Sequence, residues 1–139
     1  MNQTVGEVTW WSVGIAALAY FVLGAAWFTP LFGAAWDRSI GHGRSTSKGR
    51  FPTSYYIVPL VGAVVTTVAI TVVIALIPAT GPLIGAGIGA IVGLAIAAAT
   101  LTNALTPHTP KPYLFATITG GYHLVGCTIA GLIIGALAT

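Results

Sequence analysis

The side chains that could do chemistry are few, and they lie inside long apolar segments. His123 follows Tyr113 by ten residues, which in a helix is about 15 Å along the axis. This depth is near the middle of a bilayer, and Tyr20 lies at a similar depth in the first apolar segment. A buried histidine can mark a ligand site or a proton path in a membrane protein. The candidate residues for ligand binding or a polar relay are Tyr20, Thr67, Asn103, Tyr122 and His123.

The structural alternative, which we favour, is a neutral His123 whose nitrogen bonds to Tyr20, a threonine or a backbone carbonyl. The apolar segments hold no carboxylate, and the chain has no phosphate-binding loop, GxSxG elbow or HExxH motif. The other two histidines, His42 and His108, are expected in loops, so we expect no metal site and no cofactor. Cys127 is the only cysteine, which excludes a disulfide framework. We expect a protein that is not an enzyme.

Composition identifies the environment of these residues. Of 139 residues, 56% are hydrophobic and 5% are charged, whereas soluble domains carry about 25% charged residues. The net charge of +3 comes from five basic residues, which are too few to form a nucleic-acid-binding face. The sequence therefore predicts an integral membrane protein whose first partner is the lipid bilayer.

Four apolar windows are long enough to cross a bilayer core, which takes about 20 helical residues. None of them contains Asp, Glu, Lys or Arg. We expect an all-α, single-domain bundle over residues 1–139, built as two antiparallel hairpins. The expected spans are about 10–29, 55–77, 82–105 and 113–137, with a loop at about 30–54.

The basic residues indicate an orientation. With four spans, the first and third loops share one side of the membrane, and all five basic residues fall in these loops. The positive-inside rule places that side in the cytoplasm and both termini outside, in a bacterial-type inner membrane. The basic residues are Arg38, Arg44, Lys48, Arg50 and Lys111.

Glycines recur every four residues in the third span and again near the end of the fourth. A ridge of this kind lets another helix backbone come close, and close packing drives helix association in lipid. Packing within the chain and an interface between subunits are equally consistent with the pattern. The glycines are Gly81, Gly85, Gly89, Gly93, Gly131 and Gly135.

Two motifs resemble a known family. The run from Tyr20 to Trp36, YFVLGAAWFTPLFGAAW, is similar to the N-terminal signature of the family catalogued as domain of unknown function 1761. Asn103 and the later run Gly121-Tyr-His-Leu124 fit the C-terminal part of that family. The resemblance implies a small four-helix membrane protein and supplies no activity. The residues of the N-terminal signature are Gly24, Trp27, Pro30, Gly33 and Trp36.

We therefore expect a non-enzymatic membrane protein that forms homo-oligomers or serves as an accessory subunit. The alternative is a transporter or channel for a small solute or lipid, with a midplane polar site around His123. A packed interior around His123 would argue against that alternative.

Overall fold

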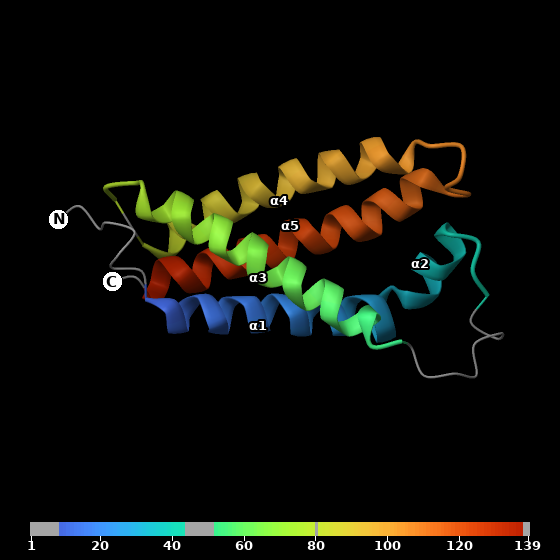
Figure 1. The fold of residues 1–139 in the computed structure, drawn as a ribbon. Coiled ribbons are helices and arrows are strands. Elements are labelled where there is room, and N and C mark those ends of the chain that lie inside the picture. The colour runs from blue at the N-terminus through green and yellow to red at the C-terminus, as the bar shows by residue number, and fades with distance from the viewer. Residues whose placement is uncertain (1–8, 44–51, 80, 138–139) are drawn as a thin grey trace.

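The computed structural model describes residues 9–43, 52–79 and 81–137, and this part of the chain is helical, with no strand (Figure 1). Four segments are long and apolar enough to cross a membrane, Trp10–Leu31, Ser54–Ala75, Pro82–Ala104 and Pro112–Leu137. The prediction of an all-α chain with four apolar spans is confirmed. The elements are α1 (Trp10–Ala26), the π-helix η2 (Trp27–Leu31), α2 (Gly33–Ser39), α3 (Ser54–Ala75), α4 (Pro82–Ala104) and α5 (Pro112–Leu137).

The end of the first span differs from the expected direct passage into a loop. Helix α1 widens into the π-turn η2, in which the Phe32 amide donates to the Trp27 carbonyl at 2.8 Å. A proline inside an α-helix clashes with the carbonyl four residues earlier, and the wider turn accommodates Pro30. The chain then forms α2 within the segment that the sequence assigned to a loop. Sequence reasoning missed both elements because the segment is short and contains a proline.

Helices α4 and α5 form the closest helix pair in the structure. A β-carbon built on Gly85, Gly89 or Gly93 of α4 would meet α5 backbone, and one built on Gly135 of α5 would meet the backbone of Gly81, just before α4. The partner position on α5 falls by four each time the position along α4 rises by four. This is the register of two antiparallel helices in backbone contact. The close positions are Gly81 with Gly135, Gly85 with Gly131, Gly89 with Cys127, and Gly93 with His123.

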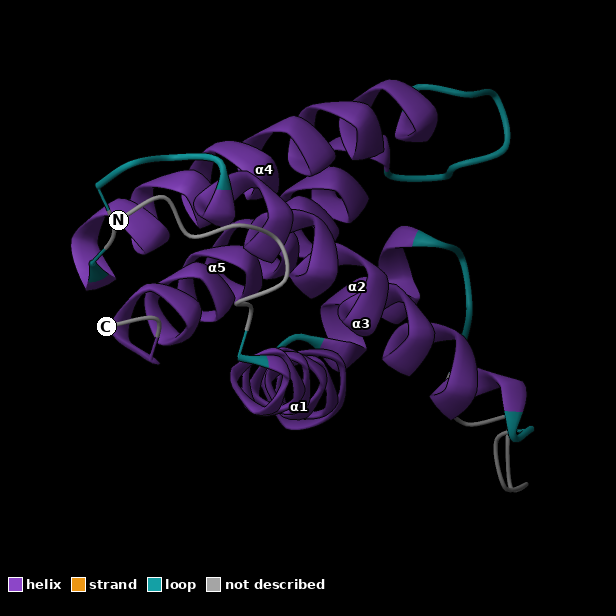
Figure 2. Ribbon diagram, turned by 60° about the vertical axis from the view of Figure 1, so that its left-hand side comes forward, coloured by secondary structure: helices purple, strands orange, loops and turns teal. Residues whose placement is uncertain are grey.

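Helix α1 packs on another side of α5, and α3 packs against α1 and α5 (Figure 1). Figure 2 shows α1 nearly end-on, apart from the α4–α5 pair. The buried core lies where α1, α3 and α5 meet, and its largest fully buried side chains include Tyr20, Ile70 and Ile134. The start of α1 and the end of α5 lie at one end of the bundle, and the α4–α5 link lies at the other.

Helix α3 leaves the bundle at one end. Residues 54–62 are all exposed, and the first buried residue of α3 is Ala63. From Ala63 onward, buried residues recur at helical spacing on the face that packs against α1 and α5. Figures 1 and 2 show α3 and α4 diverging from their short link. The first half of α3 therefore lies at the surface of the described bundle.

Candidate functional site

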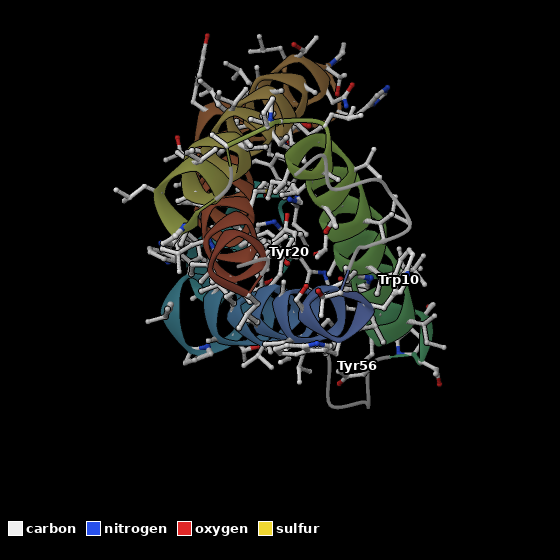
Figure 3. All side chains as sticks on the ribbon, turned by 90° about the vertical axis from the view of Figure 1, so that its left-hand side faces the viewer. Trp10, Tyr20 and Tyr56 are labelled. Carbon is white, nitrogen blue, oxygen red and sulfur yellow. The ribbon has the colours of Figure 1, made fainter. Side chains whose placement is uncertain are left out.

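The predicted polar layer centres on a contact between α1 and α5. Tyr20 Oη lies 2.5 Å from Nδ1 of His123, a short hydrogen-bond distance. The phenol donates when Nδ1 carries no hydrogen, and Nδ1–H donates to the phenol oxygen in the other tautomer, so the contact is a hydrogen bond in either form. Tyr20 is 1% exposed, and Figure 3 shows it pointing into the bundle, whereas Trp10 and Tyr56 point away. His123 itself is half-buried.

Two further α5 side chains complete the environment of Tyr20. The Cys127 thiol lies 3.6 Å from Tyr20 Oη and donates to it, and Cys127 is fully buried. The Tyr122 hydroxyl donates to the backbone carbonyl of Tyr20 at 3.3 Å, and the two tyrosine rings lie 5.1 Å apart. His123 and Cys127 are four residues apart, so both side chains lie on the face of α5 that meets α1.

Glycines make this approach possible. A β-carbon on Gly126 would overlap the ring of Tyr20. A β-carbon on Gly24 would lie 3.0 Å from the hydroxyl of Tyr122. One glycine on each helix therefore admits a tyrosine from the other, so that α1 and α5 interlock at two points.

The tryptophans of the N-terminal signature continue the contact along α5. The Trp27 indole donates to the Ile118 carbonyl at 3.0 Å, and the Trp36 indole donates to Thr119 Oγ1 at 3.3 Å. Both bonds join residues more than 80 positions apart in the chain. The π-turn and α2 thus position two indole N–H groups on consecutive residues of α5.

Aromatic rings fill the space between these hydrogen bonds. Phe28 lies edge-on to both Tyr122 and Trp36, with ring centroids 5.1 and 5.7 Å apart. Trp36 also packs against Phe115, at 6.4 Å. Edge-on aromatic pairs of this kind stabilise by about 0.5–1.5 kcal/mol beyond the area that they bury. The segment from Trp27 to Trp36 therefore contacts α5 through Trp27, Phe28 and Trp36.

The end of α2 is tied to the α4–α5 link. The Lys111 amide donates to the Ser39 carbonyl at 3.1 Å, and Ser39 is fully buried. Gly41 has a φ of +74°, and a β-carbon there would lie 3.3 Å from the ring of Pro110. A side chain at Gly41 would therefore suffer both backbone strain and crowding.

The structure brings together three of the five candidate residues, Tyr20, Tyr122 and His123. Thr67 is fully buried, but its hydroxyl donates to the Ala63 carbonyl of its own helix at 2.7 Å. Asn103 is exposed in the last turn of α4. The candidate ridge glycines of α4 face α5 of the same chain.

Sequence reasoning missed three contributors to the site. Cys127 was considered only for a disulfide, although its spacing of four from His123 is a usable signal of a shared helix face. Gly126 gave no signal, because its function depends on a tyrosine from another helix. Phe28 lay inside the recognised motif, but nothing in the sequence identified its contact with Tyr122.

The arrangement can donate, accept and hold hydrogen bonds, and no catalytic triad is evident in it. In the described ranges, no buried side-chain nitrogen or oxygen lacks a hydrogen-bond partner. Within the same ranges, no three His, Cys, Asp or Glu side chains gather as a metal site. The polar side chains of the site therefore form hydrogen bonds with one another and with the backbone, inside an apolar bundle.

A family model described as "Protein of unknown function (DUF1761)" matches residues 11–135. The match covers nearly the whole chain, so this protein belongs to that family. No curated protein and no solved structure matches the chain. The family membership agrees with the resemblance carried by the two sequence motifs, which meet where Tyr20 of the first contacts Tyr122 and His123 of the second.

Proposed function

We propose that this protein is a non-enzymatic subunit of the cytoplasmic membrane that acts through contacts with copies of itself or with a partner membrane protein. One observation carries the proposal: hydrogen-bonding side chains of its two motifs find their partners inside the same chain. Trp27, Trp36 and Tyr122 all direct their polar hydrogens to α1 or α5 acceptors. Motif residues that bond within the chain stabilise its fold. The surfaces that remain for association are then the outer faces of the helices.

The outer faces support this role. Exposed residues of α4 recur every four positions, which places them on one side of the helix away from α5. Three of them are small, so a second helix can come close. The residues on this outer line are Gly87, Ile91, Ala95, Ala99 and Asn103.

Native mass spectrometry of the full chain in lipid nanodiscs tests the association. We expect a defined homo-oligomer, and we expect Ala95→Leu to shift it toward smaller species. The control is Val65→Leu, which adds volume on the exposed face of α3. A control on the inner side of α4, such as Ala97→Leu, would instead disturb the contact with Gly120 of α5. A chain that is monomeric at every protein-to-lipid ratio, with no stoichiometric membrane partner, would contradict the proposal.

The proposed topology has two antiparallel hairpins, both termini outside and the basic loops in the cytoplasm. Support comes from Lys111 and Arg38, which the structure places near the same end of the bundle through the Ser39–Lys111 hydrogen bond. The α3–α4 link lies at the opposite end. A side with basic residues faces the cytoplasm by the positive-inside rule.

Cysteine labelling tests this orientation. In a Cys127→Ser background, an impermeant thiol reagent should label Ala79→Cys in intact cells and label His108→Cys only after the membrane is opened. Both positions are exposed in loops, which makes them a matched pair. The reverse labelling pattern would overturn the orientation while leaving the fold intact.

The alternative function, a path for a small solute or lipid, has weaker support. Tyr20, Thr67 and Cys127 are fully buried or nearly so, and each already has a hydrogen-bond partner. A solute would have to displace these bonds. The half-buried position of His123 is the feature that favours this alternative, and a measured flux abolished by His123→Ala would establish it.

A further inference from the structure

Two basic residues from distant parts of the sequence come together at one end of the bundle, where α2 meets the α4–α5 link (Figure 1). Arg38 is in the last turn of α2, and Lys111 immediately precedes α5. The Lys111 amide donates to the carbonyl of Ser39, the neighbour of Arg38, at 3.1 Å. With standard backbone dimensions, this bond holds the α-carbons of Arg38 and Lys111 within about 11 Å of each other.

We propose that Arg38 and Lys111 together bind the phosphate of an anionic phospholipid at this end of the bundle. Both side chains are exposed. Each can extend about 6 Å from its α-carbon, so the guanidinium and the ammonium can contact the same phosphate. The fork of N–H groups on arginine matches the geometry of phosphate oxygens, and lysine adds a point charge.

Within the described ranges, these two positive charges have no partner. Neither the Arg38 guanidinium nor the Lys111 ammonium forms an ion pair or a hydrogen bond with a described residue. Asp37 is the one carboxylate side chain in the same ranges, and it is only 8% exposed. His42 and His108 are exposed in the two segments that meet here, and their rings can donate further hydrogen bonds. The exposed charge of this surface is therefore complementary to a phosphate.

The depth of the two residues favours a phosphate that belongs to a lipid. Lys111 directly precedes the apolar span Pro112–Leu137, and the contact with Ser39 brings Arg38 to the same level. Basic residues at the end of a span lie among the lipid headgroups, where anionic lipids attract them. Tyr113 is 69% exposed at this level, and exposed tyrosines are typical of the headgroup region.

The fold holds the backbone that carries the two basic side chains. Ser39 is fully buried, and its hydroxyl donates to the Trp36 carbonyl at 2.6 Å. Gly41, with a φ of +74°, lies against the ring of Pro110. A lipid therefore meets two charges whose backbone positions are already set, which lowers the ordering cost of binding. The proposal is independent of the subunit role and of the orientation proposed above, because it requires only that this end of the bundle lie at a membrane surface.

Native mass spectrometry of the full chain in detergent, titrated with phosphatidylglycerol or with phosphatidylcholine, tests the site. We expect one tightly bound phosphatidylglycerol per chain and weaker binding of the zwitterionic phosphatidylcholine. Arg38→Gln and Lys111→Gln should each weaken phosphatidylglycerol binding by about 5-fold, and the double variant by about 30-fold. The matched control is Arg44→Gln/Lys48→Gln, which removes the same charge from other positions of the first loop and should weaken binding much less.

A second variant retains every charge. Gly41→Val introduces a side chain at a backbone conformation that favours glycine and crowds Pro110. We expect weaker phosphatidylglycerol binding, because the two basic residues are no longer held side by side. The thermal midpoint of each variant, measured without lipid, shows whether the bundle itself is intact.

Four results would overturn the site. The first is a wild-type chain that binds phosphatidylcholine as tightly as phosphatidylglycerol, and this result does not depend on the folding of any variant. The second is equal weakening in Arg44→Gln/Lys48→Gln, which would assign the effect to net charge. The third is displacement of the lipid by inorganic phosphate at equal concentration, which would assign the site to a soluble anion. The fourth is full binding by a folded Gly41→Val protein, which would show that Arg38 and Lys111 do not act together.

Discussion

Helix α5 has two packed faces of opposite character. Toward α4 it presents glycine and backbone, and the contact is made by main-chain atoms with almost no polar side chain. Toward α1, η2 and α2 it presents Thr119, Tyr122, His123 and Cys127, and the contact is made by hydrogen bonds and aromatic rings. Both faces lie within one apolar helix of 26 residues.

The difference separates two ways of holding helices together in lipid. In the bilayer that the four apolar helices indicate, helix association has no hydrophobic gain, so the glycine face depends on close van der Waals contact. The polar face depends on groups that would otherwise lie unpaired in an apolar medium. A larger side chain should disrupt the glycine face. Removal of a hydrogen-bonding side chain should disrupt the polar face. Substitutions can therefore test each face separately.

The largest effect is expected on the glycine face. Gly89→Leu would drive its side chain into the Cys127 carbonyl of α5, and overpacking of a rigid backbone costs about 3 kcal/mol or more. We expect that the variant does not fold in detergent, or that the temperature at which it unfolds is far lower than for the wild type. Gly62→Leu, in the exposed first half of α3, is the control, because nothing lies within 4 Å of its β-carbon position. Equal destabilisation by both variants would show that α4 does not pack on α5 through this ridge.

A smaller loss of stability is expected on the polar face, at the glycine that makes room for the ring of Tyr20. Gly126→Ala would place a methyl group against the buried ring of Tyr20, at a cost of about 1–3 kcal/mol. Gly62→Ala, with nothing within 4 Å, should be neutral or stabilising, because alanine favours a helix interior. Chemical denaturation monitored by tryptophan fluorescence measures both variants. A Gly126→Ala protein as stable as the wild type would mean that Tyr20 does not pack against α5.

The smallest effect is expected from a single hydrogen bond. Trp36→Phe removes the bond to Thr119 and retains most of the ring packing. Hydrogen bonds between membrane helices contribute about 0.6 kcal/mol on average, so we expect a loss of that size. Trp10→Phe, at a residue 65% exposed, should change stability less. A loss of several kcal/mol for Trp36→Phe would indicate that its indole does more than donate one bond.

The sequence was sufficient for the spans but not for their partners. Apolar length identified four helices because crossing a bilayer imposes that length on any sequence. The period of four located the glycine ridge on one face of α4, but periodicity does not identify which helix packs on that face. The π-turn was missed because Pro30 and the short α2 segment are also typical of a loop.

The same limit applies to the candidate site: the sequence indicated its residues but not which of them meet. Depth along the helix placed Tyr20 and His123 at one level, and Tyr20 was one of several partners open to the histidine. Which partner it meets depends on the rotation of α1 about its own axis, and Gly24 and Gly126 set that rotation through contacts made between helices. Asn103 and Thr67 were grouped with the site as polar residues of the apolar spans, although Asn103 is exposed and Thr67 bonds to its own helix.

The central claim is that the two family motifs meet inside one chain at Tyr20 and His123. A double-mutant cycle with Tyr20→Phe and His123→Leu, measured as unfolding free energy in detergent, tests it most directly. We predict a coupling energy of about 0.6–1.7 kcal/mol, the range for hydrogen bonds between membrane helices. The same cycle between His123→Leu and Tyr113→Phe, at an exposed tyrosine, should give none. Additive effects of Tyr20→Phe and His123→Leu would contradict the account.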